Sequence, residues 1–335
     1  MSFKKHRKFD LLNRVVNALE DDGWNVLYLH DTSYHPFLLR IYKNNERHDL
    51  RIYIWNLTHG GGQARREDEY RIQITGVDQF TSSDNEKVLI LGWWEQGGVF
   101  AGFDYNFHTL PLGSSPSMQI REVALRSGYV HGMGTWERDN NEIAIAIRPE
   151  FLSEYIINMN DLHSFGESKK DLEILNNVIG IDDEKNQSKI DEVTLKRRTV
   201  LQSVWKKVRD TSFKDRVLVA YSNQCSFCGL QLKLIDAAHI VPVEKDGNDM
   251  TSNGIALCAL HHRAYDRKLL GFNTDYQILI SQDKMDGLAK MGLDGERTRF
   301  EKNLRSILHL PPTISDRPHV DFITEANRIR GWNKV

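Results

Sequence analysis

The chain has 335 residues, which is more than one typical domain and predicts two. Its content of 40% apolar and 27% charged residues is typical of soluble globular proteins, and the absence of a long apolar run argues against a membrane span. The formal net charge of -2 gives no support for nucleic-acid binding through overall charge.

The first 163 residues are expected to form an α+β domain with a mixed or antiparallel sheet and flanking helices. Residues 8–20 place their aliphatic side chains on one helical face, and Gly23 closes that helix. Several runs rich in Val, Ile, Tyr and Trp then alternate like strands. They cover residues 24–30, 37–43, 49–57, 69–75, 87–94 and 99–105. Residues 118–127 resemble a short helix, and residues 141–156 resemble a strand that leads into a helix.

Charge is distributed unevenly in the middle of the chain. A linker that contains at most one helix is expected at residues 164–195, and residues 166–193 hold eight acids against four lysines, a net charge of -4. Residues 196–216 hold eight Lys or Arg against two Asp, a net charge of +6. This asymmetry suits a protein that meets a polyanion with one face, although a solvated amphipathic helix has the same pattern. Two helical stretches are expected between residue 196 and the first cysteine, and further helices near residues 294–310, up to the prolines, and 317–332.

All three cysteines of the chain belong to two short metal-binding patterns, "CSFC" and "CALH". The basic N-terminus lacks the apolar core of a secretion signal, so we expect a cytoplasmic protein with reduced thiols. Cys225, Cys228, Cys258 and His261 then have the ligand types and spacing of a tetrahedral zinc site. A redox CxxC or unrelated thiols are the alternatives. Four protein ligands leave no open position, so the predicted Zn²⁺ is structural.

The segment between the two patterns carries polar residues in a characteristic order. "DAAHIVP", "SNGIALC" and the pair "HH" contain His239, Asn253 and His262. With the cysteines, residues 200–275 resemble the HNH (ββα-metal) endonuclease family, similar to restriction endonucleases that include McrA-type enzymes. The resemblance implies a zinc-stabilised ββα-metal domain with extra helices at residues 196–335, and metal-dependent hydrolysis of double-stranded DNA.

The resemblance also implies roles for individual residues. His239 would take a proton from the attacking water, because a neutral imidazole is a suitable base near pH 7. His262 would bind the catalytic ion, Mg²⁺ or Mn²⁺, which offsets charge on the phosphate. Asn253 would orient His239 or hold the loop, as Asn before Gly254 is also typical of a turn.

Two positions depart from the family pattern. Many members have a metal-binding Asp or His directly before the general base, where this chain has Ala238. Asp236 is the nearest acid on that predicted strand, and Asp266 follows His262 by one helical turn. We expect both carboxylates to be candidate ligands of the catalytic ion, with purely structural surface roles as the alternative.

A restriction-type enzyme also needs residues that read DNA. In the N-terminal domain, Arg and Gln side chains could read base edges, and aromatic side chains could stack on a flipped base. The candidates are Arg65, Arg66, Arg71 and Gln73, with Trp93, Trp94 and His108. The alternative is that the tryptophans pack in a core and that the arginines pair with Glu67, Asp68 and Glu69.

The favoured function is therefore a restriction-type DNA endonuclease with an N-terminal reading domain, as in the restriction systems that defend cells against phage. The two strands of DNA are related by two-fold symmetry, and a protein with the same symmetry is the simplest arrangement that cuts both strands. A homodimer is therefore expected. Two other functions stay open: a zinc-stabilised DNA-binding regulator without catalysis, and an effector nuclease whose N-terminal domain binds a signal.

Overall fold

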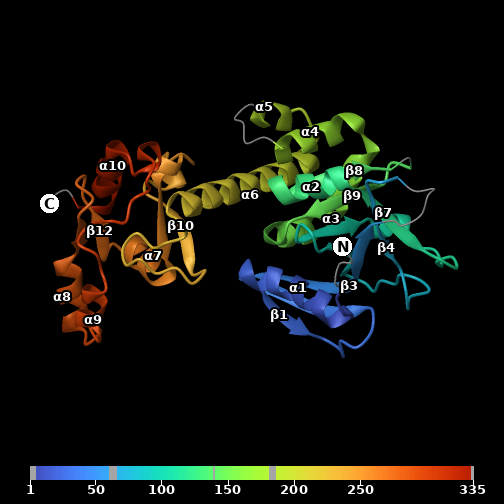
Figure 1. The fold of residues 1–335 in the computed structure, drawn as a ribbon, viewed down its shortest axis with the longest axis horizontal. Helices are drawn as coiled ribbons and strands as arrows, with labels where there is room; N and C mark the ends of the chain where they lie inside the picture. Colours follow the sequence, from blue (N-terminus) through green and yellow to red (C-terminus); the bar gives the residue numbers. More distant parts are fainter. Residues whose placement is uncertain (1–4, 60–65, 139, 181–185, 333–335) are drawn as a thin grey trace. The chain divides into compact units, whose positions relative to one another are not determined.

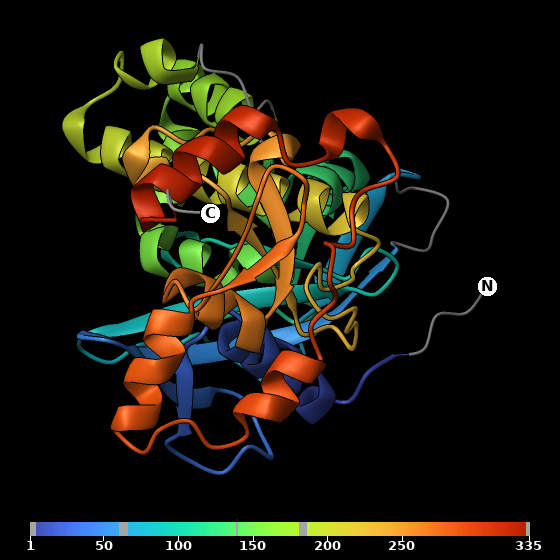
Figure 2. The same cartoon turned by 90° about the vertical axis from the view of Figure 1, so that its left-hand side faces the viewer.

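The computed structural model describes residues 5–59, 66–138, 140–180 and 186–332. The chain divides into two compact units, Met1–Val208 (unit 1) and Arg209–Val335 (unit 2), and Figures 1 and 2 show the ribbon from two directions. Both units combine helices with strands, which confirms the α+β class. Within the described ranges, no helix has the length and apolar character needed to cross a membrane.

One nine-stranded sheet is the framework of unit 1. Its main path is β1-β2-β3-β5-β6-β9-β8, and β4 pairs with both β3 and β7. The β3–β5 pair is parallel and the others are antiparallel, so the sheet is mixed, as expected. The strands are β1 Asn25–Tyr28, β2 Phe37–Lys43, β3 Glu46–His59, β4 Glu69–Gln73, β5 Glu86–Trp94, β6 Val99–Phe103, β7 Ser117–Arg121, β8 Met133–Glu137 and β9 Ile143–Ile147.

Strand β9, with the sequence IAIAI, illustrates how the sheet buries both faces. Its isoleucines belong to one hydrophobic core, while Ala144 and Ala146 belong to a second core on the other face. Small side chains on the second face let α2 (Glu122–His131) pack closely, since a Cβ added to Gly128 would lie 2.8 Å from the Cβ of Ala146. The single helix expected at residues 118–127 is not present: its first four residues belong to β7, and the others begin α2.

The helices of unit 1 extend beyond the expected domain boundary at residue 163. They are α1 Lys8–Asp21, α2, α3 Leu152–Ser164, α4 Lys169–Gly180, α5 Asn186–Ile190 and the first part of α6 Leu195–Ala220. Leu172, Leu175 and Val178 of α4 lie at helical spacing and are buried in the first core. Leu201 and Val204 of α6 belong to the same core. The segment expected as a linker thus packs as part of unit 1, because α4 is an amphipathic helix whose aliphatic face is buried in this core.

Unit 2 contains a strand–strand–helix arrangement with its own hydrophobic core. Strands β10 (Ile235–His239) and β11 (Gly254–Cys258) pair antiparallel, with His239 opposite Gly254. Helix α7 (Ala259–Asp266) follows β11 directly. In place of the two helices expected before the first cysteine there is one, because α6 continues without interruption to Ala220.

The rest of unit 2 surrounds this arrangement. It comprises β12 Leu270–Phe272, β13 Ile278–Ile280, α8 Gln282–Lys290, α9 Arg297–Lys302 and α10 Val320–Arg330. Helix α9 is much shorter than the helix expected to reach residue 310. The chain beyond it is extended because its amides bind elsewhere: Arg305 donates to the carbonyl of Phe227, and His309 donates to that of Ser226, at 2.8 and 2.9 Å.

Candidate active site and metal centre

Four residues of unit 2 bring metal-binding atoms together. The sulfurs of Cys225, Cys228 and Cys258 and a ring nitrogen of His261 all lie within 4.8 Å of one another. The Nδ1 atom of His261 lies 3.3 Å from the sulfur of Cys258 and 3.5 Å from that of Cys225. Three of the four residues are buried and Cys228 is half-buried. Three thiolates and an imidazole so arranged fit a closed tetrahedral zinc site.

Local backbone structure explains why these ligands converge. Gly229 takes a left-handed conformation with φ of 82°, and its amide donates to the carbonyl of Cys225 at 2.8 Å, which closes a tight turn. Cys258 directly precedes α7, so His261 lies in the first turn of that helix. A hydrogen bond from Cys258, opposed by burial and helped by His261, lowers the pKa of Cys225 to about 3. This direction favours the thiolate, the form of cysteine that binds metal.

His239 ends strand β10 and is held by side chains on both sides. Its ring stacks on Phe213 of α6, with centroids 3.8 Å apart and planes 5° from parallel. Its Nε2 atom lies 2.9 Å from Oδ1 of Asp249. Helix α6 can pack this closely because Gly254 lies opposite His239, where a Cβ would be 2.3 Å from Cγ2 of Val217.

Asp249 lies at this site although no sequence motif pointed to it. Its Oδ2 atom accepts hydrogen bonds from Nε and Nη2 of Arg209, at 2.9 and 2.6 Å. Burial raises the pKa of Asp249, but hydrogen bonds from Arg209 and His239 outweigh burial and hold that pKa below its usual range. The sequence signal for this residue is weak, since it is one of several acids in a polar loop.

Asn253 is fully buried beneath the loop that joins β10 to β11. Its Oδ1 accepts from the amide of Val241 at 2.9 Å, and its Nδ2 donates to the carbonyls of Val241 and Asn248 at 3.1 and 2.8 Å. These contacts favour the loop-holding role over direct contact with His239. A buried amide whose donors and acceptor are all satisfied makes the loop rigid.

His262 points away from the cysteine cluster that its neighbour completes. Its side chain is 29% exposed, and Nε2 lies 3.7 Å from Oδ2 of Asp266 one helical turn later. Asp236, in contrast, pairs with Lys214 of α6 at 3.0 Å. Within the described ranges, the cysteine cluster is the one set of three or more His, Cys, Asp or Glu that converges on a point. His262 and Asp266 together offer one nitrogen and one oxygen, so a divalent ion held there would need water and phosphate to complete its coordination.

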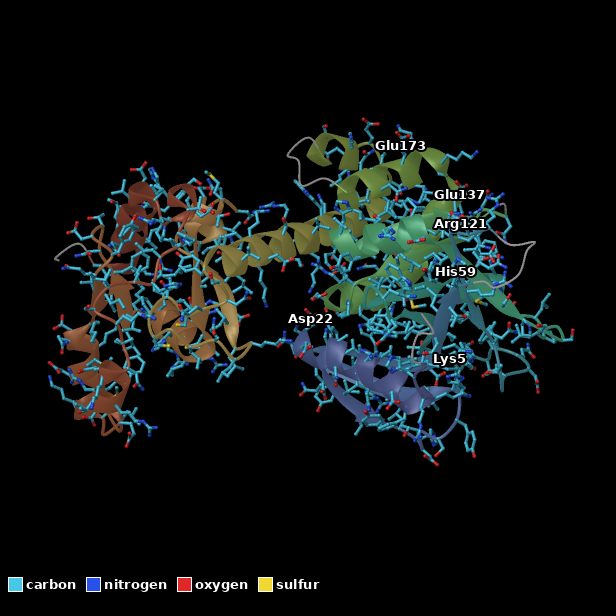
Figure 3. All side chains as sticks on the ribbon, viewed as in Figure 1. Lys5, Asp22, His59, Arg121, Glu137 and Glu173 are labelled. Atoms are coloured by element: carbon cyan, nitrogen blue, oxygen red, sulfur yellow. The ribbon has the colours of Figure 1, made fainter. Side chains whose placement is uncertain are left out.

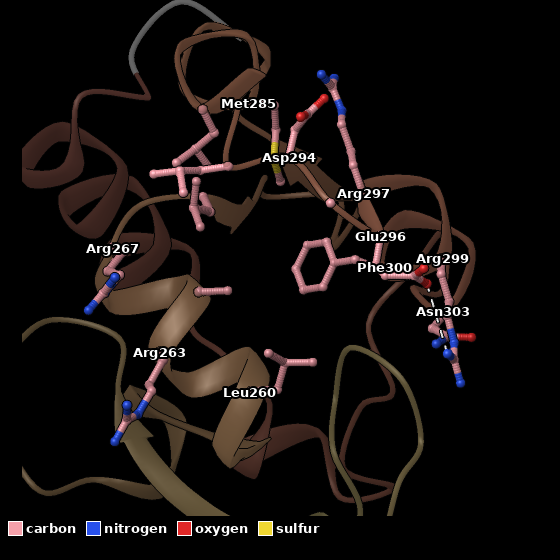
Figure 4. A pocket seen from close by; sticks show the side chains of 15 residues that line it. Leu260, Arg263, Arg267, Met285, Asp294, Glu296, Arg297, Arg299, Phe300 and Asn303 are labelled. Atoms are coloured by element: carbon pink, nitrogen blue, oxygen red, sulfur yellow. Dashed lines mark ion pairs between the residues drawn. The ribbon is translucent and has the colours of Figure 1, made fainter. Parts of the chain in front are cut away.

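A cavity of about 580 Å³ lies against another side of α7. Apolar side chains from α7, α8 and α9 line it, among them Leu260, Met285 and Phe300. Arg263 and Arg267 of α7 also border the cavity, and Figure 4 shows both guanidinium groups directed away from Phe300. Both arginines are exposed, and in the described part of the chain no ion pair to either is found. Helix α7 and its C-terminal end therefore present two exposed cations at the rim of this cavity.

The DNA-reading residues expected in unit 1 fall into different environments. Arg65 lies outside the described residues. Arg66 is exposed, whereas Arg71 forms an ion pair with Glu69. Gln73 donates a hydrogen bond to a backbone carbonyl 3.0 Å away. Of these candidates within the described ranges, Arg66 is the one whose side chain has no polar contact in the structure.

The aromatic candidates of unit 1 match the structural alternative. Trp93 and Trp94 are both buried, and they pack in the two cores on opposite faces of the sheet. His108 lies 2.8 Å from the buried carboxylate of Glu142. None of the three is presented as a stacking surface for a base.

The acidic side chains beside these candidates also have partners. Glu69 pairs with Arg71, as the alternative interpretation expected, and Asp68 pairs with Arg121 rather than with Arg66. The position of Arg121 in unit 1, near His59, is shown in Figure 3. This cluster of charges is therefore largely satisfied within the protein.

Comparison with known proteins gives two family matches. Residues 225–273 match the family model described as HNH endonuclease, and residues 48–156 match the model described as Methylase-associated X1. No curated protein matches the chain. A solved structure described as "Modification dependent TagI restriction endonuclease" is 12% identical, with a TM-score of 0.30, over 82% of this chain and 80% of that chain.

The first match confirms the resemblance based on His239, Asn253 and His262, and it falls on the strand–strand–helix arrangement of unit 2. The second match lies within unit 1, on the mixed sheet. The two matches together support a restriction-type nuclease with a recognition domain at its N-terminal end. The roles of single residues remain predictions.

Proposed function

We propose that this chain, whose residues 225–273 form an HNH endonuclease domain, is a metal-dependent endonuclease that cleaves double-stranded DNA. The main supporting observation is the separation of its two neighbouring histidines. His261 completes the buried cysteine cluster, while His262 lies with Asp266 on the surface of the same helix. One helix thereby joins a structural zinc site to a second, exposed site.

His239 is the proposed general base. Its Nε2 atom is engaged by Asp249, which leaves Nδ1 to accept a proton from the attacking water. Phe213 holds the plane of the ring, so that its unshared nitrogen keeps one direction. Positioning of this kind accounts for much of the rate enhancement in hydrolysis.

His262, with Asp266, is the proposed binding site for the catalytic divalent ion. Mg²⁺ or Mn²⁺ bound there supplies Lewis-acid stabilisation of charge on the scissile phosphate and the leaving 3′ oxygen. Asp236 lies opposite Leu257 in the hairpin and forms an ion pair with Lys214, so we assign it a lesser share in this site. Zn²⁺ is the ion proposed for the cysteine cluster.

Recognition of DNA sequence or modification is assigned to unit 1. The reading function expected for residues 1–163 is proposed for that unit as a whole, because residues 164–208 share its core. The match to a methylase-associated domain supports a role in sensing methylation. Arg66 is the favoured DNA contact among the described candidates, and Arg65 is retained as a neighbouring one. A homodimer acting in the cytoplasm completes the proposal.

The test is cleavage of plasmids that differ in methylation, in the presence of Mg²⁺ or Mn²⁺. The wild-type chain should cut at least one of these plasmids only when the divalent ion is present. His239→Ala should lower the cleavage rate by about 100-fold or more, since general base catalysis contributes that much. His30→Ala removes an imidazole from an exposed position in unit 1 and should leave the rate unchanged.

Three results would contradict the proposal. The first is that no plasmid is cut with either ion, which would favour a DNA-binding regulator. The second is equal cutting by wild type and His239→Ala. The third is cutting that begins only after a small molecule is added, which would favour a signal-activated effector nuclease.

A further inference from the structure

The loop between β10 and β11 and the second half of α6 meet around His239. From this geometry we infer that Asp249 is a positioning residue for His239, itself held in place by Arg209. The inference rests on the proposed nuclease function, and it adds an acid that the HNH resemblance did not point to.

The two carboxylate oxygens of Asp249 have separate partners. Oδ1 lies 2.9 Å from Nε2 of His239, and Oδ2 accepts two hydrogen bonds from the guanidinium of Arg209, at 2.9 and 2.6 Å. The Asp249 side chain is only 12% exposed. Because both oxygens are occupied from opposite sides, the carboxylate cannot rotate without breaking one set of contacts.

An ionised carboxylate here determines which nitrogen of His239 carries the proton. Ionised Asp249 is purely an acceptor, so Nε2 must be the protonated nitrogen. Nδ1 then keeps its lone pair, which is the form that a general base requires. Without Asp249, the neutral ring could place its proton on either nitrogen, and a share of the molecules would present the wrong one.

Helix α6 supplies the other contacts from a single face. Arg209, Phe213 and Arg216 follow one another at helical spacing. Arg209 binds the Asp249 carboxylate, Phe213 stacks on His239, and Nη2 of Arg216 donates to the backbone carbonyl of Asp249 at 2.8 Å. Part of the basic stretch that suggested a DNA-facing surface is thus used to hold the active-site histidine.

In the proposed step, His239 acts on the water that attacks the scissile phosphate. A water oxygen forms a bond to phosphorus while one proton of that water passes to Nδ1 of His239. The bond from phosphorus to the 3′ oxygen breaks, and that oxygen takes a proton from solvent. The imidazolium formed at His239 lies beside the Asp249 carboxylate, which stabilises its positive charge.

Two variants test the inference in the full-length chain. Asp249→Asn keeps the size of the side chain but removes its charge. Asp246→Asn is the matched control, because Asp246 is an exposed acid in the same loop with φ of 62°, a conformation that Asn tolerates. Thermal unfolding should show that both variants remain folded.

The first measurement is the tautomer of the His239 ring, followed by NMR of ¹⁵N-labelled histidine without added divalent ion. His239→Ala identifies its signal among the 13 histidines. Wild type should carry the proton on Nε2 of His239, which faces Asp249. Asp249→Asn should raise the share of rings with the proton on Nδ1, because the amide can present its NH₂ group to Nε2 while its oxygen accepts from Arg209. Asp246→Asn should leave the tautomer unchanged.

The second measurement is single-turnover cleavage against pH. Asp249→Asn should cut about 100-fold more slowly, with DNA affinity within about twofold of wild type, since only the base is affected. The loss should persist at each pH measured, because a ring with its proton on Nδ1 cannot accept the proton of the attacking water there.

Each remaining outcome contradicts the inference. A change of tautomer without loss of rate means that the contact does not position the base. Loss of rate without a change of tautomer means that the loop, rather than the carboxylate, was altered. If wild type cuts no DNA, the proposed function fails and the positioning role fails with it, while the NMR result still reports whether the His239–Asp249 pair exists.

Discussion

At the scale of single residues, His261 and His262 have different surroundings although they are neighbours in sequence. Replacement of His261 by Ala should remove a zinc ligand, lower bound zinc and unfold unit 2, because metal binding contributes directly to folding. His262→Ala should keep both the fold and the zinc. Its cleavage rate should fall about 100-fold or more, because a catalytic ion contributes several kcal/mol to transition-state stabilisation. Zinc analysis measures the bound metal, circular dichroism measures the fold, and plasmid cleavage measures the activity. If both variants retain zinc and differ from wild type only in activity, this assignment is wrong.

His35 in unit 1 should make that unit sensitive to acid. Burial, with help from the charge of Lys8, lowers its pKa to about 3, and its neutral ring accepts the amide of Ile54 at 3.2 Å. The unfolded chain binds a proton below about pH 6.5, whereas the folded chain does not. The stability that the neutral His35 ring contributes is therefore fully present above about pH 6.5. It decreases by about 1 kcal/mol per pH unit as the pH falls toward about 3.

The check is urea unfolding at about pH 7 and about pH 5 for wild type and His35→Gln. The variant should be less stable at neutral pH but should lose less stability on acidification, since Gln does not titrate. His30→Gln, at an exposed position, should follow the wild-type pH dependence. An equal loss of stability in all three chains would contradict the assignment.

At the scale of elements, the sequence predicted best those features whose residue spacing is set by metal coordination. The two metal-binding patterns and the hairpin between them were found from residue types alone, since zinc requires ligands of fixed kind and spacing. Asp249 was not found, because its role depends on α6 packing beside a loop 40 residues later. The packing of α4 into unit 1, in a segment expected to be a linker with at most one helix, was not predicted for a related reason: the core that buries its aliphatic face is built by distant strands.

Helix α7 yields a prediction about DNA binding. Arg263 and Arg267 are exposed, lie one turn apart and border the apolar cavity beside α7. If both contact phosphates, the double variant with Ala should reduce the slope of log affinity against log salt by about 1.8, since each contact contributes about 0.9. Binding of a short duplex in the His239→Ala background avoids cleavage during the measurement. Arg328→Ala is the control, because Arg328 is paired with Glu325 at 2.6 Å. An unchanged slope, or an equal change in the control, would rule out these contacts.

At the scale of the whole molecule, the hydrophobic cores of the two units are built from separate residues. The cores of unit 1 end with Val208 of α6, and the core of unit 2 begins with Phe213 of the same helix. The cysteine cluster belongs to unit 2, where Cys225 and Cys258 are themselves core residues. Stabilisation by metal should therefore be local to unit 2, although both units share one continuous helix.

Removal of zinc tests this separation. After treatment with a strong chelator, amide hydrogen exchange should rise in β10, β11 and α7, because the ligands that join them lose their common ion. Exchange in β5, β6 and β9 should stay slow, because these strands are buried on both faces by apolar side chains that do not depend on metal. Peptide-resolved mass spectrometry of the full chain measures both regions in one experiment.

Cys258→Ala should reproduce the result without chelator. Exchange that rises equally in the central strands of unit 1 would mean that the units unfold together, and exchange that rises in neither region would mean that the cysteine cluster does not hold a structural ion.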